Sequence, residues 1–236
     1  MKSVFLTAEW LNLVMANYEI DPSILTKYIP AKTELDTWHG MYFISLVGFQ
    51  FFNTRIMGIK IPFHADFEEV NLRFYVRRKI DDDWRRGVVF INEIVPKRAI
   101  AFVANSLYDE KYKVAKMRSM IYGRTGLNVR YEWKIKGQWN KIYFHTRSEA
   151  GTIGEGSLEE FIAEHYWGYN RVNETKTTEY QVEHPRWRVY HADDYSVGCD
   201  FTSVHGKDFS CLNSLAPQSV FMADGSEIKV RRGSII

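Results

Sequence analysis

Residues 67–79 read FEEVNLRFYVRRK, and this stretch decides the fold class. Its apolar and polar residues alternate strictly, which is the period of a β-strand with two different faces. One face consists of Val70, Leu72, Phe74 and Val76. The opposite face consists of Glu69, Asn71, Arg73 and Tyr75. The sequence therefore predicts a strand with a buried aliphatic face and a polar face that looks either into solvent or into an enclosed cavity.

The segments around this strand also read as short strands separated by turn residues. An acidic turn leads from it into RRGVVFINEIV (85–95), which completes a β-hairpin. MYFISLVGFQF (41–51) is almost wholly apolar and predicts a strand covered on both faces. Further strands are predicted at 98–108, 127–136, 141–147, 177–184 and 186–192, while 11–20 fits either a strand or a helix. Asp224-Gly225 within SVFMADGSEIKV (219–230) predicts a C-terminal hairpin.

Two helix starts are marked by capping residues. Asp21 followed by Pro22 predicts a short helix, with the aspartate as N-cap and the proline in the first turn. Ser157 and Glu160 form a capping box at the start of GSLEEFIAEHYWGY (156–169). In that run Leu158, Phe161, Ile162 and His165 share one helical face.

Many strands and few helices at 236 residues predict a mainly β (α+β) fold. We expect a closed antiparallel β-barrel with a few peripheral helices, because closure removes the sheet edges that so many strands would otherwise expose. No Pro/Gly/Ser-rich linker and no internal repeat divides the chain, so residues 1–236 are predicted to form a single domain.

The composition restricts the class of partner. The 31 Lys+Arg nearly balance the 29 Asp+Glu and give a net charge of +2, which disfavours nucleic acid. No apolar stretch approaches the length of a membrane span, and the N-terminus lacks a signal-peptide pattern. Cys199 and Cys211 are too few for a disulfide framework, although one disulfide between them stays open, so we expect a reduced, cytoplasmic protein. The sequence leaves open whether the chain forms a homo-oligomer.

Five phrases in order resemble the YqjF-like family of uncharacterised proteins, a fold relative of acetoacetate decarboxylase. They are FEEVNLRFYV, RRGVVFINEIVPK, ANSLYDEKY, SLEEFIAEHYWGY and APQSVFMADGSEIKV. The resemblance covers nearly the whole chain. It implies a barrel with a central cavity and helices packed on its outside, but no particular reaction.

Acetoacetate decarboxylase itself suggests a candidate nucleophile. That enzyme's Schiff-base lysine follows an Ala-Ile-Ala strand, and AIAFVANSLYDEK (99–111) laid on this pattern puts Lys111 at the same place. The enzyme's pocket arginine and glutamate have no counterpart, since Ala8 and Ile44 fall near their positions. A nucleophilic lysine needs a pKa near 7 instead of about 10.4. Lys113 would supply less than about two units of that change, so burial would have to supply the rest. Alternatively, Lys111 is a solvated strand-end residue.

The polar face of residues 69–75 is the other candidate site. In a cavity, Arg73 would pair with a carboxylate and Glu69 would orient the ligand or act as acid or base, with Asn71 and Tyr75 as further contacts. His64, in the loop before the strand, could reach the barrel mouth or simply form a local hydrogen bond. If the face looked outward, these residues would be hydrated or form a structural ion pair. The seven histidines show no metal-ligand spacing, and no cofactor motif is present, so neither a metal nor a cofactor is predicted.

Three hypotheses follow. The first is a barrel that binds a small organic molecule bearing a carboxylate or carbonyl group, through Glu69, Asn71, Arg73, Tyr75 and His64. The second is a Schiff-base lyase acting on a keto acid through Lys111. The third is a non-catalytic structural or interaction domain whose interior is filled. The sequence alone leaves enzymatic activity undecided.

Overall fold

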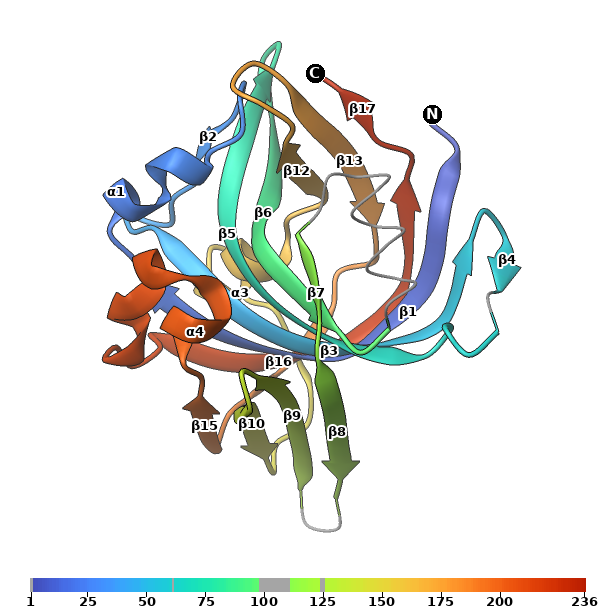
Figure 1. Ribbon diagram of the computed structural model, residues 1–236, viewed down its shortest axis with the longest axis vertical. Helices are drawn as coiled ribbons and strands as arrows, with labels where there is room; N and C mark the ends of the chain where they lie inside the picture. Colours follow the sequence, from blue (N-terminus) through green and yellow to red (C-terminus); the bar gives the residue numbers. More distant parts are fainter. Residues whose placement is uncertain (1, 61, 98–110, 124–125) are drawn as a thin grey trace.

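The computed structural model describes residues 2–60, 62–97, 111–123 and 126–236 (Figure 1). In these residues most strands belong to one large sheet. Its strands are β1 (Val4–Glu19), β2 (Glu34–Leu35), β3 (Phe43–Ile56), β4 (Ile59–Lys60), β5 (Phe67–Ile80), β6 (Asp83–Val95), β7 (Tyr112–Val114), β11 (Gly151–Thr152), β12 (Trp167–Arg171), β13 (Thr177–Glu183), β14 (Arg188–His191), β16 (Ser219–Arg231) and β17 (Ser234–Ile235). A smaller sheet contains β8 (Lys116–Tyr122), β9 (Leu127–Ile135), β10 (Gln138–Thr146) and β15 (Asp194–Gly198).

Helical segments in the described residues are short. They are α1 (Pro22–Leu25), α3 (Leu158–Ala163), α4 (Phe201–His205) and the 3-10 helices η1 (Thr26–Tyr28) and η2 (Lys207–Asn213). Both predicted N-caps are present, because Asp21 accepts a hydrogen bond from the Ser23 amide and Ser157 accepts one from the Glu160 amide. No helix in the described part of the chain is long and apolar enough to cross a membrane.

The large sheet closes on itself. Its strands run in the order β16-β1-β3-β5-β6-β12-β13, and β13 then pairs with β16 through Val182↔Val230 and Glu183↔Lys229. The predicted fold class, mainly β with a few helices and largely antiparallel strands, is confirmed, and the exceptions to antiparallel pairing in the described residues are β12 and β7, which both run parallel to β6. The hydrogen-bonded ring therefore has two short junctions, one between β6 and β12 and one between β13 and β16, where only two residue pairs join the strands.

The two faces of β5 lie in two separate cores, as the alternation predicts. Val70, Leu72, Phe74 and Val76 face outward and are fully buried. They pack against the small sheet and the C-terminal helical segments. These elements contribute the buried residues Tyr131, Trp133, Phe144, Phe201 and Phe209. The small sheet lies below the ring in Figure 1, and α4 lies at its side. The other face of β5 looks into the ring.

Helix α3 fills one end of the ring interior. Its residues Phe161, Ile162 and Ala163 are buried in the same apolar cluster as Met15 and Val47 of the ring strands. The helix was predicted to continue through His165, but it ends at Ala163, and His165 lies in the segment before β12. The predicted strand at 98–108 lies outside the described residues.

The predicted C-terminal hairpin was also wrong. Residues 219–231 form one continuous strand, β16, which pairs with β1 over almost its whole length. Gly225 does have the left-handed conformation expected of a turn, with φ +91, but it sits within the strand opposite Leu11. A side chain there would collide with the Trp10 carbonyl oxygen, so glycine allows the two strands to approach. Asp-Gly therefore marks an irregularity in a curved strand and not a reversal.

The β6–β12 junction gives a test of ring closure. A Cβ at Gly87 would lie 2.5 Å from the Trp167 carbonyl oxygen and 2.6 Å from the Tyr169 ring, so the strands must separate to admit it. We expect Gly87→Ala to lower the free energy of unfolding by about 2 kcal/mol in urea titrations. Gly151→Ala, where nothing lies within 4 Å of the added carbon, is the control. Equal losses in the two variants would contradict the close approach at this junction.

Candidate functional site

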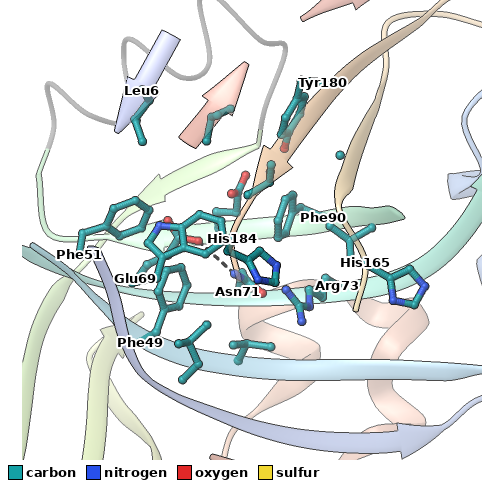
Figure 2. A pocket seen from close by; sticks show the side chains of 18 of the residues that line it. Leu6, Phe49, Phe51, Glu69, Asn71, Arg73, Phe90, His165, Tyr180 and His184 are labelled. Carbon is teal, nitrogen blue, oxygen red and sulfur yellow. Dashed lines mark hydrogen bonds between the residues drawn. The ribbon is translucent and has the colours of Figure 1, made fainter. Parts of the chain in front are cut away.

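The ring interior beyond α3 contains a cavity of about 120 Å³. Its apolar wall includes Leu13, Val47, Phe49, Phe51, Phe67 and Phe90. Its polar groups include Glu69, Asn71, Arg73, Glu93, Tyr112, His165 and His184 (Figure 2). Since one water needs about 10–15 Å³, the cavity has room for a small organic molecule. An apolar enclosure with a few convergent polar groups is the usual form of a ligand site.

Three residues of the predicted polar face of 69–75 line this cavity. Glu69, Asn71 and Arg73 follow one another along β5 with their side chains on the cavity side (Figure 2). Asn71 also lies in register with Glu93 of β6, which in turn lies opposite Tyr112 of β7. Asn71, Glu93 and Tyr112 thus form a row of polar residues across the neighbouring strands β5, β6 and β7.

Glu69 is a buried carboxyl group held by its neighbours. It is 2% exposed, accepts a hydrogen bond from the Asn71 amide at 3.0 Å and another from the Tyr112 hydroxyl at 3.0 Å. Burial raises the pKa of Glu69 to about 7, although these hydrogen bonds and the charge of Arg73 act in the opposite direction. A carboxyl group that titrates near neutral pH can donate or accept a proton.

Arg73 is a cation with poor partners. Its side chain donates to the Ile162 carbonyl oxygen at 3.4 Å and approaches the Met15 sulfur, and its guanidinium lies 5.8 Å from the Tyr75 ring centre. Its Nε makes no hydrogen bond, and no carboxylate of the described residues forms an ion pair with it. Arg73 is 9% exposed, so the charge is largely removed from water. Such a group is costly unless something pairs with it.

His165 lies on the far side of Arg73 from Glu69 (Figure 2). Its Nε2 is 3.2 Å from a carboxylate oxygen of Asp36, which also accepts from Arg86 at 2.6 Å. Burial lowers the pKa of His165 to about 4, with the hydrogen bond to Asp36 opposing. For Asp36, burial works against ionisation, but the hydrogen bonds from His165 and Arg86 outweigh it and lower the pKa. The imidazole is therefore neutral at pH 7 and donates through Nε2.

His184 approaches the cavity from the loop after β13. Its ring stacks on Trp187, with centroids 3.9 Å apart, and stands over Asn71 and Arg73 in Figure 2. Nδ1 lies 2.9 Å from the Pro185 carbonyl oxygen, which can only accept, so Nδ1 carries the proton. Burial lowers the pKa of His184 to about 4, opposed by that hydrogen bond and assisted by Arg73. This imidazole is also neutral at pH 7.

Two of the predicted binding residues lie outside the cavity wall. Tyr75 is buried beside α3, where its hydroxyl is 2.6 Å from that of Ser45 and its ring packs on Phe161 and His165. It supports the end of the site instead of lining it. His64 lies in the loop before β5 and is hydrogen-bonded to the Pro62 carbonyl oxygen, which is the local role the sequence left open.

Lys111 lies on the outer side of the ring. Its side chain is exposed, and its ammonium lies 5.7 Å from the Tyr28 ring centre in a surface depression that also contains Arg171. Partial burial and Arg171 lower its pKa, but the next residue, Tyr112, is the one that enters the cavity. No lysine lines the cavity, and none of the residues left undescribed is a lysine, so this holds for every lysine of the chain. The geometry therefore speaks against a Schiff base in this cavity.

Other chemistries find little support in the described residues. They contain no group of three His, Cys, Asp or Glu side chains placed to hold a metal ion. Cys199 and Cys211 are both free thiols. Among the described residues, the candidate chemistry of the cavity thus rests on one cation, carboxyl groups, an amide, a phenol and two neutral imidazoles.

Sequence reasoning missed four cavity residues: Glu93, Tyr112, His165 and His184. Glu93 carries a weak signal, because it is the one acid inside the apolar run of β6. To identify Tyr112, one would have to know which face of β7 points into the ring. That strand has only three residues, too few to show a periodic pattern. The two histidines lie outside regular elements, where no periodicity indicates a direction.

Comparison with known proteins agrees with this fold. The model of the DUF2071 family of uncharacterized conserved proteins matches residues 7–227. The chain is 27% identical over 202 residues to the uncharacterized protein YqjF of Bacillus subtilis (strain 168), covering 84% of this chain and 80% of that protein.

Two solved structures share the fold at low identity. One is the enduracididine biosynthesis enzyme MppR complexed with pyruvate, with a TM-score of 0.67, 11% identity, and coverage of 100% of this chain and 91% of that one. The other is an acetoacetate decarboxylase-like enzyme from Sphingomonas wittichii RW1, with a TM-score of 0.66, 12% identity, and coverage of 99% and 93%. The predicted family resemblance and the acetoacetate decarboxylase-like fold are confirmed.

The raised pKa of Glu69 predicts a specific pH dependence of stability. A folded-state pKa above the unfolded value means that the stabilisation is fully present below about pH 4.5 and is lost as pH rises through about 7. Glutamine mimics the protonated acid and has no such loss. We expect the free energy of unfolding of Glu69→Gln to rise relative to the wild type between these pH values, by an amount on the order of 3 kcal/mol. A constant difference across this range, in parallel denaturant titrations, would contradict the assignment.

The position of Lys111 predicts the outcome of Schiff-base trapping. Treatment with pyruvate and borohydride should leave the mass of the intact protein unchanged, because no lysine amine reaches the cavity. Lys111→Ala should give the same result as the wild type. A reduced adduct mapped by peptide mass spectrometry to Lys111 would revive the lyase hypothesis.

Proposed function

The chain belongs to the DUF2071 family of uncharacterized conserved proteins, and from that premise we propose that it binds a small organic carboxylate in the cavity of its strand ring. The observation that carries the proposal is the buried guanidinium of Arg73. It lines the cavity and has no ion-pair partner in the described residues. A ligand carboxylate would supply the missing charge.

The energetics favour an anion at this place. Burying an ionised group without a partner costs several kcal/mol, and hydrogen bonds to a charged group are worth about 1.5–3 kcal/mol each. Arginine is suited to the role because its planar donors match a carboxylate in two parallel hydrogen bonds. The free Nε of Arg73 is one such donor.

Glu69 and Asn71 would orient the rest of the ligand. Because the pKa of Glu69 is about 7, its carboxyl group is partly protonated at neutral pH and can lie near a bound anion with little repulsion. Asn71 donates a hydrogen bond to Glu69 through its amide, and its Oδ1 is buried with no hydrogen-bond partner in the described residues. Glu69 would serve either as an orienting group or as an acid or base.

The aromatic wall selects a small ligand with an apolar part. Phe49, Phe51 and Phe67 form a packed cluster, with the Phe51 and Phe67 rings stacked at 4.6 Å. Together with a volume of about 120 Å³, this suits a short carbon skeleton better than a polyvalent or bulky molecule. The fold relative MppR was solved as a complex with pyruvate, a three-carbon carboxylate of this kind, which supports three-carbon acids as first probes.

The two alternatives have less support. A Schiff-base lyase needs an amine in the cavity, and Lys111 lies outside it. A purely structural domain would be expected to fill its interior, whereas this ring keeps a cavity with unsatisfied polar groups. Whether the bound molecule also reacts is a separate question.

The test of the proposal is removal of the Arg73 charge. Propionate and pyruvate should bind the wild type in calorimetric or ligand-observed NMR titrations, and Arg73→Met should weaken both by about 10- to 100-fold or more, since it removes charged hydrogen bonds. Arg147→Met, which alters an exposed arginine at the end of the small sheet, is the matched control. Unchanged affinity in Arg73→Met, or no binding of either acid to the wild type, would refute the proposal.

A further inference from the structure

We infer that the natural ligand is a small hydroxy carboxylate, whose hydroxyl group donates a hydrogen bond to acceptors grouped around Arg73. This inference rests on the proposed carboxylate site and specifies its ligand class. It comes from polar side-chain atoms of cavity-lining residues that have no hydrogen-bond partner in the described residues. Asn71 Oδ1 and His165 Nδ1 are acceptors, Arg73 Nε and Trp10 Nε1 are donors, and a carboxylate alone offers the acceptors nothing.

His184 contributes the first acceptor. Its Nδ1 proton is used by the Pro185 carbonyl oxygen, so Nε2 at the outer edge of the ring has only a lone pair. The ring is held in place by its stack on Trp187, and it stands over Asn71 and Arg73 (Figure 2). Its orientation and its tautomer are thus fixed before any ligand arrives.

His165 contributes the second acceptor with the opposite tautomer. Here Nε2 carries the proton and donates to Asp36, which leaves a lone pair on Nδ1. That Nδ1 is buried and has no hydrogen-bond partner in the described residues. The side chain of His165 is 1% exposed, and the residue lines the cavity on the other side of Arg73.

Asn71 contributes the third acceptor. Its amide nitrogen is used by Glu69, and its Oδ1 is buried without a partner in the described residues. The guanidinium group of Arg73, by contrast, can only donate hydrogen bonds. A buried polar atom left unpaired is destabilising, so a ligand that satisfies even one of the buried acceptors binds more tightly.

The choice between ligand classes follows from their donors. A saturated acid brings no polar group besides its carboxylate, and a keto acid adds only a carbonyl acceptor, so both satisfy Arg73 and leave the imidazole lone pairs unpaired. A hydroxyl group can donate to one of these lone pairs while accepting from Arg73. An ammonium group could donate too, but it would place a second positive charge beside Arg73 in a poorly solvated cavity. The hydroxy acid is therefore the best match.

The experiment compares four acids with the same three-carbon skeleton on the intact protein: propionate, pyruvate, lactate and alanine. Ligand-observed NMR titrations would give their dissociation constants, with the two enantiomers of lactate and of alanine measured separately. We expect one lactate enantiomer to bind at least about 10-fold more tightly than propionate, the equivalent of one satisfied hydrogen bond. Pyruvate should bind no more tightly than propionate.

His184→Phe provides the variant. The phenyl ring preserves the stack on Trp187 and removes the nitrogen acceptor, so the preference for lactate over propionate should shrink. If this variant fails to fold, the wild-type series still decides. Equal binding of lactate and propionate, or tighter binding of pyruvate or alanine, would overturn the hydroxyl inference and leave the Arg73 carboxylate site intact. No binding of any acid would overturn both.

Discussion

Apolar and polar side chains alternate along β5, and this alternation constrains both the packing outside the ring and the groups inside it. Because neighbouring side chains of a strand point to opposite faces, this one strand serves two cores at once. Its aliphatic residues, such as Leu72 and Phe74, anchor the small sheet and the C-terminal helical segments on the outside of the ring. The intervening residues Glu69, Asn71 and Arg73 are thereby forced into the interior. The outer packing thus sets which residues of β5 face the interior.

Most of these buried groups are either neutral at pH 7 or paired with a neighbour, which lowers the free-energy cost of burying them. Glu69 shifts toward its neutral form, and the two cavity imidazoles are neutral at pH 7. Asp36 keeps its charge with the help of Arg86 and so fixes the orientation of His165. Arg73 remains as a cation without an ion-pair partner among the described residues. An arginine side chain stays protonated in proteins, so its buried charge can be compensated only by a nearby anion. In the proposed function that anion is the ligand.

The sequence predicts this arrangement as far as local periodicity extends. The alternation of 69–76, the capping residues Asp21 and Ser157 and the abundance of strands lead to the correct fold class. Prediction fails where a residue's role depends on a distant partner. Asp224-Gly225 has the composition of a turn, but its pairing with β1 holds it inside a strand. His165 was predicted on a helical face and His184 carries no pattern, and loops that return to the ring interior place both of them there. Tyr75 shares the face of Arg73, yet α3 covers it, and the position of that helix cannot be read from β5 alone.

Lys111 and Tyr112 are neighbours in the chain, but only Tyr112 lines the cavity, so the position of a single residue decides which chemical group is available there. Adjacent strand residues face opposite sides, so a shift of one position decides whether an amine or a phenol enters the ring. Here the phenol enters and hydrogen-bonds Glu69, while the lysine lies outside against Tyr28. A covalent imine is then no longer available, but the enclosure, the cation and the acid remain. In the proposed function they serve recognition through charge and hydrogen bonds, and Glu69, whose pKa burial raises to about 7, is a group able to transfer a proton. The fold alone therefore does not determine the chemistry of the cavity that it encloses.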